Sequence, residues 1–221
     1  GGGGGGAVGG ALAYAVRGCP AWGGGAGVEL AATVGGMGLA LSCGLVLVFL
    51  LRAKSAFVSY PTRALLEFLR GTPLLIQLFF LFYVLPEWGI TLGALGTGIF
   101  ALGLHYGTYI AEVYRAGIES VPHGQWEAAT ALSLSPAVTW RRIVLPQAIR
   151  TVLPMLGNYL VAMVKDTPLL ATITVIEMLG AGLSAAASSY RYLEVFTMIG
   201  LIFLAMSLPA DRTTHLAFID D

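Results

Sequence analysis

Apolar runs long enough to cross a lipid bilayer constrain this chain more than any other feature. The first covers residues 33–51 without a charged residue, and four more follow at 74–85, 92–114, 151–164 and 195–208. A hydrocarbon core of about 30 Å needs about 20 helical residues, so the shorter runs require helical flanks. Only 11% of the residues are charged, whereas soluble domains have roughly 25%. The sequence therefore predicts an all-α integral membrane protein with about five transmembrane helices.

The positively charged residues indicate how such a bundle is oriented. Cytoplasmic flanks of membrane proteins carry an excess of Lys and Arg. The segments after the first and third runs hold most of the cations, namely Arg52, Lys54, Arg63, Arg70, Arg115, Arg141, Arg142 and Arg150. This asymmetry predicts an N-terminus outside the cell and a C-terminus inside. The second helix is expected to begin near residue 63, and the end of the fourth stays open between 164 and 173.

The two ends of the chain differ from its apolar centre. Residues 1–27 contain runs of glycine and are predicted to form a flexible external lead. Residues 28–208 are assigned to the transmembrane domain, and residues 209–221 to a short cytoplasmic tail. The formal net charge is zero, so no attraction to nucleic acid is expected. The histidines and cysteines have no metal-ligand spacing, so no metal site is expected.

The longest segment predicted to lie in the cytoplasm, residues 117–150, has the pattern of folded structure. Pro122 ends one helix, and an alanine-rich stretch after it favours a short second helix. Ser135 can cap a further helix, whose first position suits Pro136. Two short helices joined at a Ser-Pro corner would project from the bundle. We therefore expect a docking surface for another protein.

This segment also carries a spaced motif. Glu127-Ala128-Ala129 is followed by Ser133 and, nine residues further on, by Ile143-Val144-Leu145-Pro146. The motif resembles the Glu-Ala-Ala signature of bacterial ABC importer permeases, in which a glycine stands at the position of Ser133. Serine is small, so the geometry of the turn is expected to be kept.

Six other stretches narrow the resemblance to permeases for polar amino acids of the histidine, glutamine and arginine type. They are residues 70–75, 109–115, 121–126, 145–148, 157–158 and 165–167. The whole resemblance covers about residues 33–203. It implies the type I ABC importer permease architecture, in a multi-pass protein of the bacterial cytoplasmic (inner) membrane.

The resemblance also implies partner chains. Two permease subunits, identical or paralogous, would form the pathway, and two separate ATPase subunits would bind ATP and magnesium. An extracytoplasmic solute-binding protein would deliver a polar amino acid, and this chain itself would bind no cofactor. For Trp126, packing within the corner is as good an explanation as contact with the ATPase. The residues expected at the docking surface are Gln125, Trp126, Glu127, Ala128, Ala129, Ser133, Leu145 and Pro146.

The chain has no ATPase motif of its own. A phosphate-binding loop needs Gly-x4-Gly-Lys followed by Ser or Thr. Lys54-Ser55 is the only lysine before a hydroxyl residue, and Val48 and Ala53 occupy the two glycine positions. The sequence therefore predicts a transport subunit and not an enzyme. The alternative is a secondary transporter driven by an ion gradient, although the internal repeat typical of such proteins is not evident.

Polar residues within the apolar runs predict a substrate pathway. Charges inside a span are costly and usually face the interior of a bundle. Asn158 lies about two helical turns before Lys165, so both can face one cavity. An amino-acid zwitterion needs a cation for its carboxylate and acceptors for its ammonium. The candidate pathway residues are Asn158, Lys165, Asp166, Thr167, Gln77 and Thr72.

Structural alternatives remain open for these candidates. Lys165 and Asp166 can simply neutralise each other at the outer edge of the fourth span. Interhelical hydrogen bonds explain Gln77 and Thr72 equally well. Tyr159 stands where similar permeases for cationic amino acids often have an acid, which argues against an arginine-type substrate.

Overall fold

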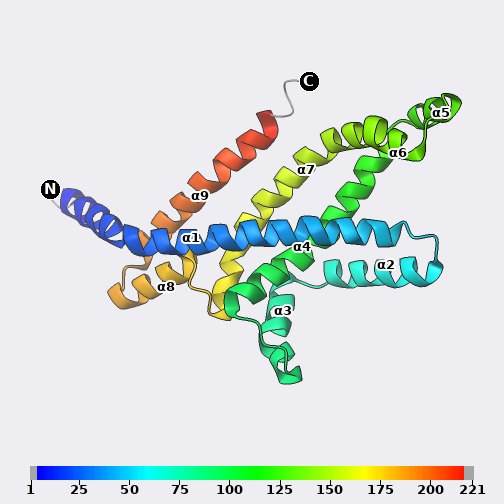
Figure 1. Cartoon of the computed structure of the whole chain (residues 1–221). Coiled ribbons are helices and arrows are strands. Elements are labelled where there is room, and N and C mark those ends of the chain that lie inside the picture. Colours follow the sequence, from blue (N-terminus) through cyan, green and yellow to red (C-terminus); the bar gives the residue numbers. More distant parts are fainter. Residues whose placement is uncertain (1–3, 217–221) are drawn as a thin grey trace.

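The computed structural model describes the backbone of residues 4–216 and the side chains of residues 24–205. Every regular element in this part of the chain is a helix, which confirms the predicted all-α fold (Figure 1). The first half contains α1 (Gly4–Leu51), α2 (Ala56–Gly71), α3 (Leu74–Phe79), η1 (Phe80–Val84), η2 (Leu85–Trp88) and α4 (Ala94–Glu119). The second half contains α5 (His123–Ala131), α6 (Pro136–Thr139), η3 (Trp140–Val144), α7 (Leu145–Asp166), η4 (Thr167–Ile173), α8 (Met178–Ser189) and α9 (Tyr192–Leu216).

The long helix α1 packs mainly against α4, and glycines allow the two backbones to approach closely. A Cβ atom on Gly44 of α1 would lie 2.7 Å from the Ile110 side chain. A Cβ on Gly103 of α4 would lie 2.6 Å from the Leu39 side chain. Small residues at helix interfaces permit this contact, which gains dispersion energy where lipid supplies no hydrophobic driving force between helices.

The main core lies between α1, α3, α4, α7 and η4. Its fully buried members include Leu78, Leu102, Ile110, Met163 and Leu170. A smaller core joins α8 to α9 through Met178, Ala186, Val195 and Ile199. In Figure 1, α5 and α6 project from the end of the molecule opposite to α8.

The structure differs from the flexible backbone predicted for the N-terminal lead, whose external position stays a prediction. The backbone of residues 4–27 is helical and continuous with α1, whereas the glycine runs favoured a flexible segment. At Gly25, a Cβ atom would lie 2.7 Å from the backbone nitrogen of Met178, so α1 packs closely on the start of α8.

The predicted boundary at residue 208 is not a break in the structure either. Helix α9 runs through it to Leu216, so the residues assigned to the tail continue that helix as far as 216. Residues 1–3 and 217–221 of the predicted lead and tail lie outside the described residues.

The number of spans cannot be read directly from helix length and hydropathy. One described helix, Gly24–Leu51, is long and apolar enough to cross a membrane alone, and up to three spans result if each bent pair counts as one. Helix α4 has 26 residues, but its buried interior position tolerates His105, Tyr106 and Thr108, which lower its hydropathy. The five-span count and the orientation therefore stay predictions.

The second predicted span is divided at Thr72 and Pro73. The axes of α2 and of the helical stretch Leu74–Trp88 differ by 104°. Pro73 has no backbone N–H to continue α2. The Gln77 side-chain amide donates to the carbonyl oxygens of Leu69 at 2.6 Å and Thr72 at 3.0 Å, which satisfies the open end of α2. The structure thus has a bend, stabilised by the Gln77 side chain, where a straight helix was expected.

Candidate functional site

The projecting segment predicted from the sequence is present as a corner formed by α5, α6 and η3. Helix α5 begins after Pro122, and α6 begins at Pro136 after Ser135. Ser133 has a φ of 51°, the left-handed conformation that favours glycine. The N–H of Leu134 donates to the Ala129 carbonyl at 3.0 Å, which closes the end of α5. Ser133 thus has a backbone conformation that glycine adopts without strain, as expected if it stands at the glycine position of the signature.

A small apolar core fixes the corner to the bundle. It consists of buried Val121, Val144 and Ala148, with Ile118, Trp126 and Trp140 packed against them. The rings of Trp126 and Trp140 meet edge to face, with centroids 5.6 Å apart. Of the two explanations open for Trp126, the structure favours packing within the corner.

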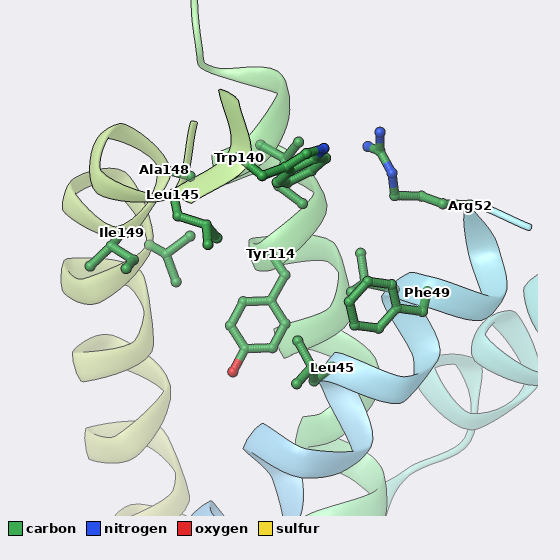
Figure 2. A pocket seen from close by; sticks show the side chains of 11 residues that line it. Leu45, Phe49, Arg52, Tyr114, Trp140, Leu145, Ala148 and Ile149 are labelled. Atoms are coloured by element: carbon green, nitrogen blue, oxygen red, sulfur yellow. The ribbon is translucent and has the colours of Figure 1, made fainter. Parts of the chain in front are cut away.

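The other predicted docking residues fall into two groups. Gln125, Glu127 and Ala128 are exposed on α5, and Ala129 is buried beneath them. Leu145 and Pro146 are exposed on the first turn of α7. Leu145 lines an apolar cleft between α1 and α7 (Figure 2). The predicted docking residues are therefore exposed at two places, on α5 and on the first turn of α7, and their contact with an ATPase stays a prediction.

The predicted pathway residues also separate. The Tyr106 hydroxyl of α4 donates to Asp166 Oδ2 of α7 at 2.7 Å. Lys165 and Asn158 are exposed, and Lys165 forms no ion pair with Asp166 or with another described residue. The proposed neutralising pair is thus absent from residues 24–205. Asp166 instead joins α4 to α7.

The remaining three candidates are held by backbone groups. Thr167 is fully buried and donates to the Val164 carbonyl at 2.7 Å. Thr72 donates to the Phe68 carbonyl at 2.7 Å. The Gln77 amide stabilises the bend between α2 and α3. These three side chains therefore have backbone partners, and the substrate pathway stays a prediction for all six residues.

A group of aromatic rings beside Asp166 was not predicted. Tyr159 of α7 lies near Tyr106 and Tyr109 of α4, with ring centroids 6.2 and 5.7 Å apart. His105 adds a fourth ring, 5.3 Å from Tyr109. Ring faces attract cations, so rings beside a carboxylate suit an ammonium group. The i, i+3 and i, i+4 spacing of aromatics in α4 was the available signal.

A buried acid in α1 was also missed. Glu29 is fully buried, and neither its carboxylate oxygens nor the Thr33 hydroxyl has a hydrogen-bond partner within residues 24–205. Thr167 and Glu177 lie within interaction range of Glu29. The Glu177 carboxylate accepts from the backbone N–H groups of Leu179 and Gly180, both at 2.7 Å, and so caps α8. A glutamate directly before the first apolar run was the signal for this site.

Charged residues connect α2 with α4 at the end of the bundle nearer the corner. Arg115 pairs with Glu112, three residues before it, at 2.7 Å and with Glu119, four residues after it, at 2.9 Å. Arg70 of α2 reaches Glu112 at 3.5 Å. Among the described residues there is no group of three or more His, Cys, Asp or Glu side chains that could hold a metal ion.

Comparison with known proteins identifies the family. The model of the binding-protein-dependent transport system inner membrane component matches residues 36–216. The probable amino-acid ABC transporter permease y4tG of Sinorhizobium fredii is 44% identical over 83% of this chain and 80% of that protein. The octopine transport system permease OccM of Rhizobium meliloti is 36% identical over 85% of this chain and 81% of that protein.

Solved structures agree with this result. A crystal structure of an amino acid ABC transporter with histidines matches with a TM-score of 0.86 and 29% identity, covering 91% of this chain and 94% of that one. An inward-facing structure of the MetNI methionine ABC transporter shares the fold, with a TM-score of 0.67 and 19% identity, over 87% of this chain and 94% of that one. These matches decide against the secondary transporter. The chain belongs to the family of binding-protein-dependent transport system inner membrane components, as an ABC importer permease that leaves ATP hydrolysis to a separate subunit.

Proposed function

We propose that this permease carries a polar amino acid across the bacterial cytoplasmic membrane, with the corner facing the cytoplasm. Its partners would be two ATPase subunits that bind ATP and magnesium, a second permease subunit and an extracytoplasmic solute-binding protein. The relatives named as amino-acid and octopine permeases support this substrate class. The single observation that carries the coupling is the exposed helix α5, held by a packed core on the ends of α4 and α7.

Helix α5 would be the contact with the ATPase. Gln125, Glu127 and Ala128 present polar and small groups to the outside, while Trp126 and Ala129 face inward. A partner that binds ATP can bias the permease only through contacts that differ between two states. A movement of α5 passes through the Trp126–Trp140 contact to α7 and through Val121 to α4. These are the two helices that carry Tyr106 and Asp166.

The substrate would bind where Tyr106 and Asp166 join these helices. The Asp166 carboxylate, with Tyr106, Tyr109 and Tyr159 around it, can accept an ammonium group. Lys165 is exposed and unpaired among the described residues, so it is available for a carboxylate. Because a sliding movement of α4 against α7 would break the 2.7 Å hydrogen bond, binding and movement are linked at this point.

Uptake by the reconstituted complex tests this proposal. Proteoliposomes with permease, ATPase and binding protein should accumulate a labelled polar amino acid only when ATP is present on the ATPase side. Neutral, acidic and cationic amino acids compared as competitors would define the substrate, and lysine or arginine should compete weakly because Tyr159 replaces an acid. Uptake that follows an ion gradient without ATP would contradict the proposal.

A further inference from the structure

An apolar cleft of about 550 Å³ separates the end of α1 from the start of α7. Figure 2 shows Leu45 and Phe49 on the α1 side, and Leu145 and Ile149 on the α7 side. Leu45 is 50% exposed and Phe49 is 68% exposed. The volume lies within the roughly 300–1,000 Å³ range of ligand sites. The full lining is Leu45, Val48, Phe49, Arg52, Tyr114, Ile118, Trp140, Leu145, Ala148, Ile149 and Val152.

The only charged residue of this lining is Arg52, in the turn directly after the end of α1. Arg52 also lines a second, polar cavity of about 440 Å³ between α1, α2 and α4. A molecule with an apolar chain and an anionic head can therefore fill the cleft while its head lies at Arg52. The lining of the polar cavity is Leu51, Arg52, Arg63, Leu66, Glu67, Arg70, Glu112, Arg115 and Glu119.

Four arginines and three glutamates, Glu67 among them, line the polar cavity, so one positive charge is left over around Arg52. Arg70 and Arg115 are paired with Glu112 and Glu119. Within residues 24–205, neither Arg52 nor Arg63 forms an ion pair, and both side chains are exposed. An unpaired guanidinium beside an apolar cleft favours a ligand that brings its own negative charge.

The neighbouring residues indicate that Arg52 lies at the depth of lipid headgroups. Phe57 and Tyr60, in the first turns of α2, are 93% and 70% exposed. Exposed aromatic rings are enriched at the boundary between membrane and water. An arginine at this level, with an apolar cleft along the same helix, contacts the headgroup region while its neighbours contact acyl chains.

We propose that the cleft binds one anionic phospholipid, with its phosphate at Arg52 and an acyl chain between Phe49 and Ile149. The proposal rests on the proposed function in one respect, that this end of the bundle faces the cytoplasm, where anionic lipids give the leaflet its negative potential. The bound chain would lie against Trp140 and Leu145, at the base of the corner. Lipid composition would then change how firmly the corner is coupled to α1.

Native mass spectrometry of the purified permease–ATPase complex tests this directly. The complex is offered phosphatidylglycerol or phosphatidylcholine with identical acyl chains. We expect one retained phosphatidylglycerol per permease, with about a fivefold preference over phosphatidylcholine, the factor typical of one cationic side chain at a membrane surface. Arg52→Ala should remove that preference. Lys54→Ala is the matched control, because Lys54 lines neither cavity, and it should keep the preference.

A second pair of variants tests the acyl chain. Leu45→Trp should fill the cleft and release the lipid, whereas Val46→Trp, next to it but outside the lining, should not. Excess inorganic phosphate should leave the bound lipid in place, because phosphate alone does not fill the cleft. Equal retention of the two lipids by the unaltered complex, or equal behaviour within either pair of variants, would overturn the proposal.

Two further outcomes separate this proposal from its alternatives. The unaltered permease could retain no lipid while Leu45→Trp breaks the contact between two permease subunits. That result would show that a second copy fills the cleft, and it would overturn the proposal. Loss of lipid binding with ATP-driven uptake intact would leave the proposed function standing. Lipid retention is measured without transport, so the lipid proposal and the proposed transport function can fail independently.

Discussion

The indole ring of Trp126 meets that of Trp140 edge to face, with ring planes at 80°. Trp126 belongs to α5, and Trp140 begins the η3 turn that leads into α7. Aromatic pairs in this geometry contribute about 0.5–1.5 kcal/mol beyond the burial of their area. The exposed helix of the corner is thereby fixed to a helix that carries the candidate substrate site.

Trp126→Ala should therefore uncouple ATP hydrolysis from transport. Removal of the ring leaves α5 free to move without displacing α7, so the number of solute molecules transported per ATP should fall severalfold. Trp126→Phe should keep most of the ratio of solute molecules transported to ATP hydrolysed, because an aromatic contact is kept. Trp88→Ala, at an exposed site away from the corner, is the control. An unchanged ratio in Trp126→Ala would show that the contact transmits no movement.

Asp166→Asn should impair uptake more strongly than assembly. Loss of a hydrogen bond to a charged group costs about 1.5–3 kcal/mol, so the apparent KM for uptake should rise at least tenfold if Asp166 also holds the ammonium group. Tyr106→Phe should give a smaller rise, because the carboxylate remains. Tyr190→Phe, at an exposed site, should have no effect. Uptake by Asp166→Asn with an unchanged KM would assign Asp166 to structure alone.

Ser133→Gly should stabilise the corner. A residue with a Cβ atom costs roughly 1–2 kcal/mol in the left-handed conformation, and Ser133 has a φ of 51°. The gain in thermal stability, measured in detergent, is reduced by the greater freedom of glycine in the unfolded chain. Ser135→Gly offers a matched control, because its φ of −63° requires no glycine. A lower melting temperature for Ser133→Gly than for Ser135→Gly would contradict this explanation of the signature glycine.

Gly103→Ala should destabilise the contact between α1 and α4. The added Cβ atom would lie 2.6 Å from the Leu39 side chain, and overpacking of this kind typically costs about 1–3 kcal/mol. Gly38→Ala adds a Cβ atom with no neighbour within 4 Å, so it should be neutral or slightly stabilising. Thermal unfolding of the purified permease compares the two. Equal melting temperatures would mean that the close approach of the helices is not required.

The sequence predicts the helices well where apolar runs or turn residues mark them. The 33–51 run lies within α1, and the Pro122 and Ser135-Pro136 signals coincide with the starts of α5 and α6. Helix α8 was missed because its small residues give neither a strong apolar run nor amphipathic spacing. The helical backbone of residues 4–27 was missed because runs of glycine favour a flexible segment.

In the candidate site, the type of a polar residue predicted its role only where its side chain had a single possible partner. Asp166 was chosen because a charge in an apolar run is costly and usually faces the interior of a bundle, and its partner in the structure is Tyr106. Gln77 was equally polar, yet it satisfies carbonyl groups freed by the turn at Pro73, which no local pattern predicts. The rings around Tyr159 come from two helices, so their proximity depends on how α4 packs on α7.

Copurification of the ATPase with the Glu127→Lys permease tests the central claim most directly. Glu127 is exposed on α5, so the reversed charge should leave membrane insertion and permease stability unchanged. Glu87→Lys, at an exposed position on η2, is the matched control and should copurify the ATPase normally. We predict that Glu127→Lys loses both the copurifying ATPase and ATP-driven uptake. Normal copurification together with normal uptake by Glu127→Lys would contradict the assignment of α5 as the docking helix.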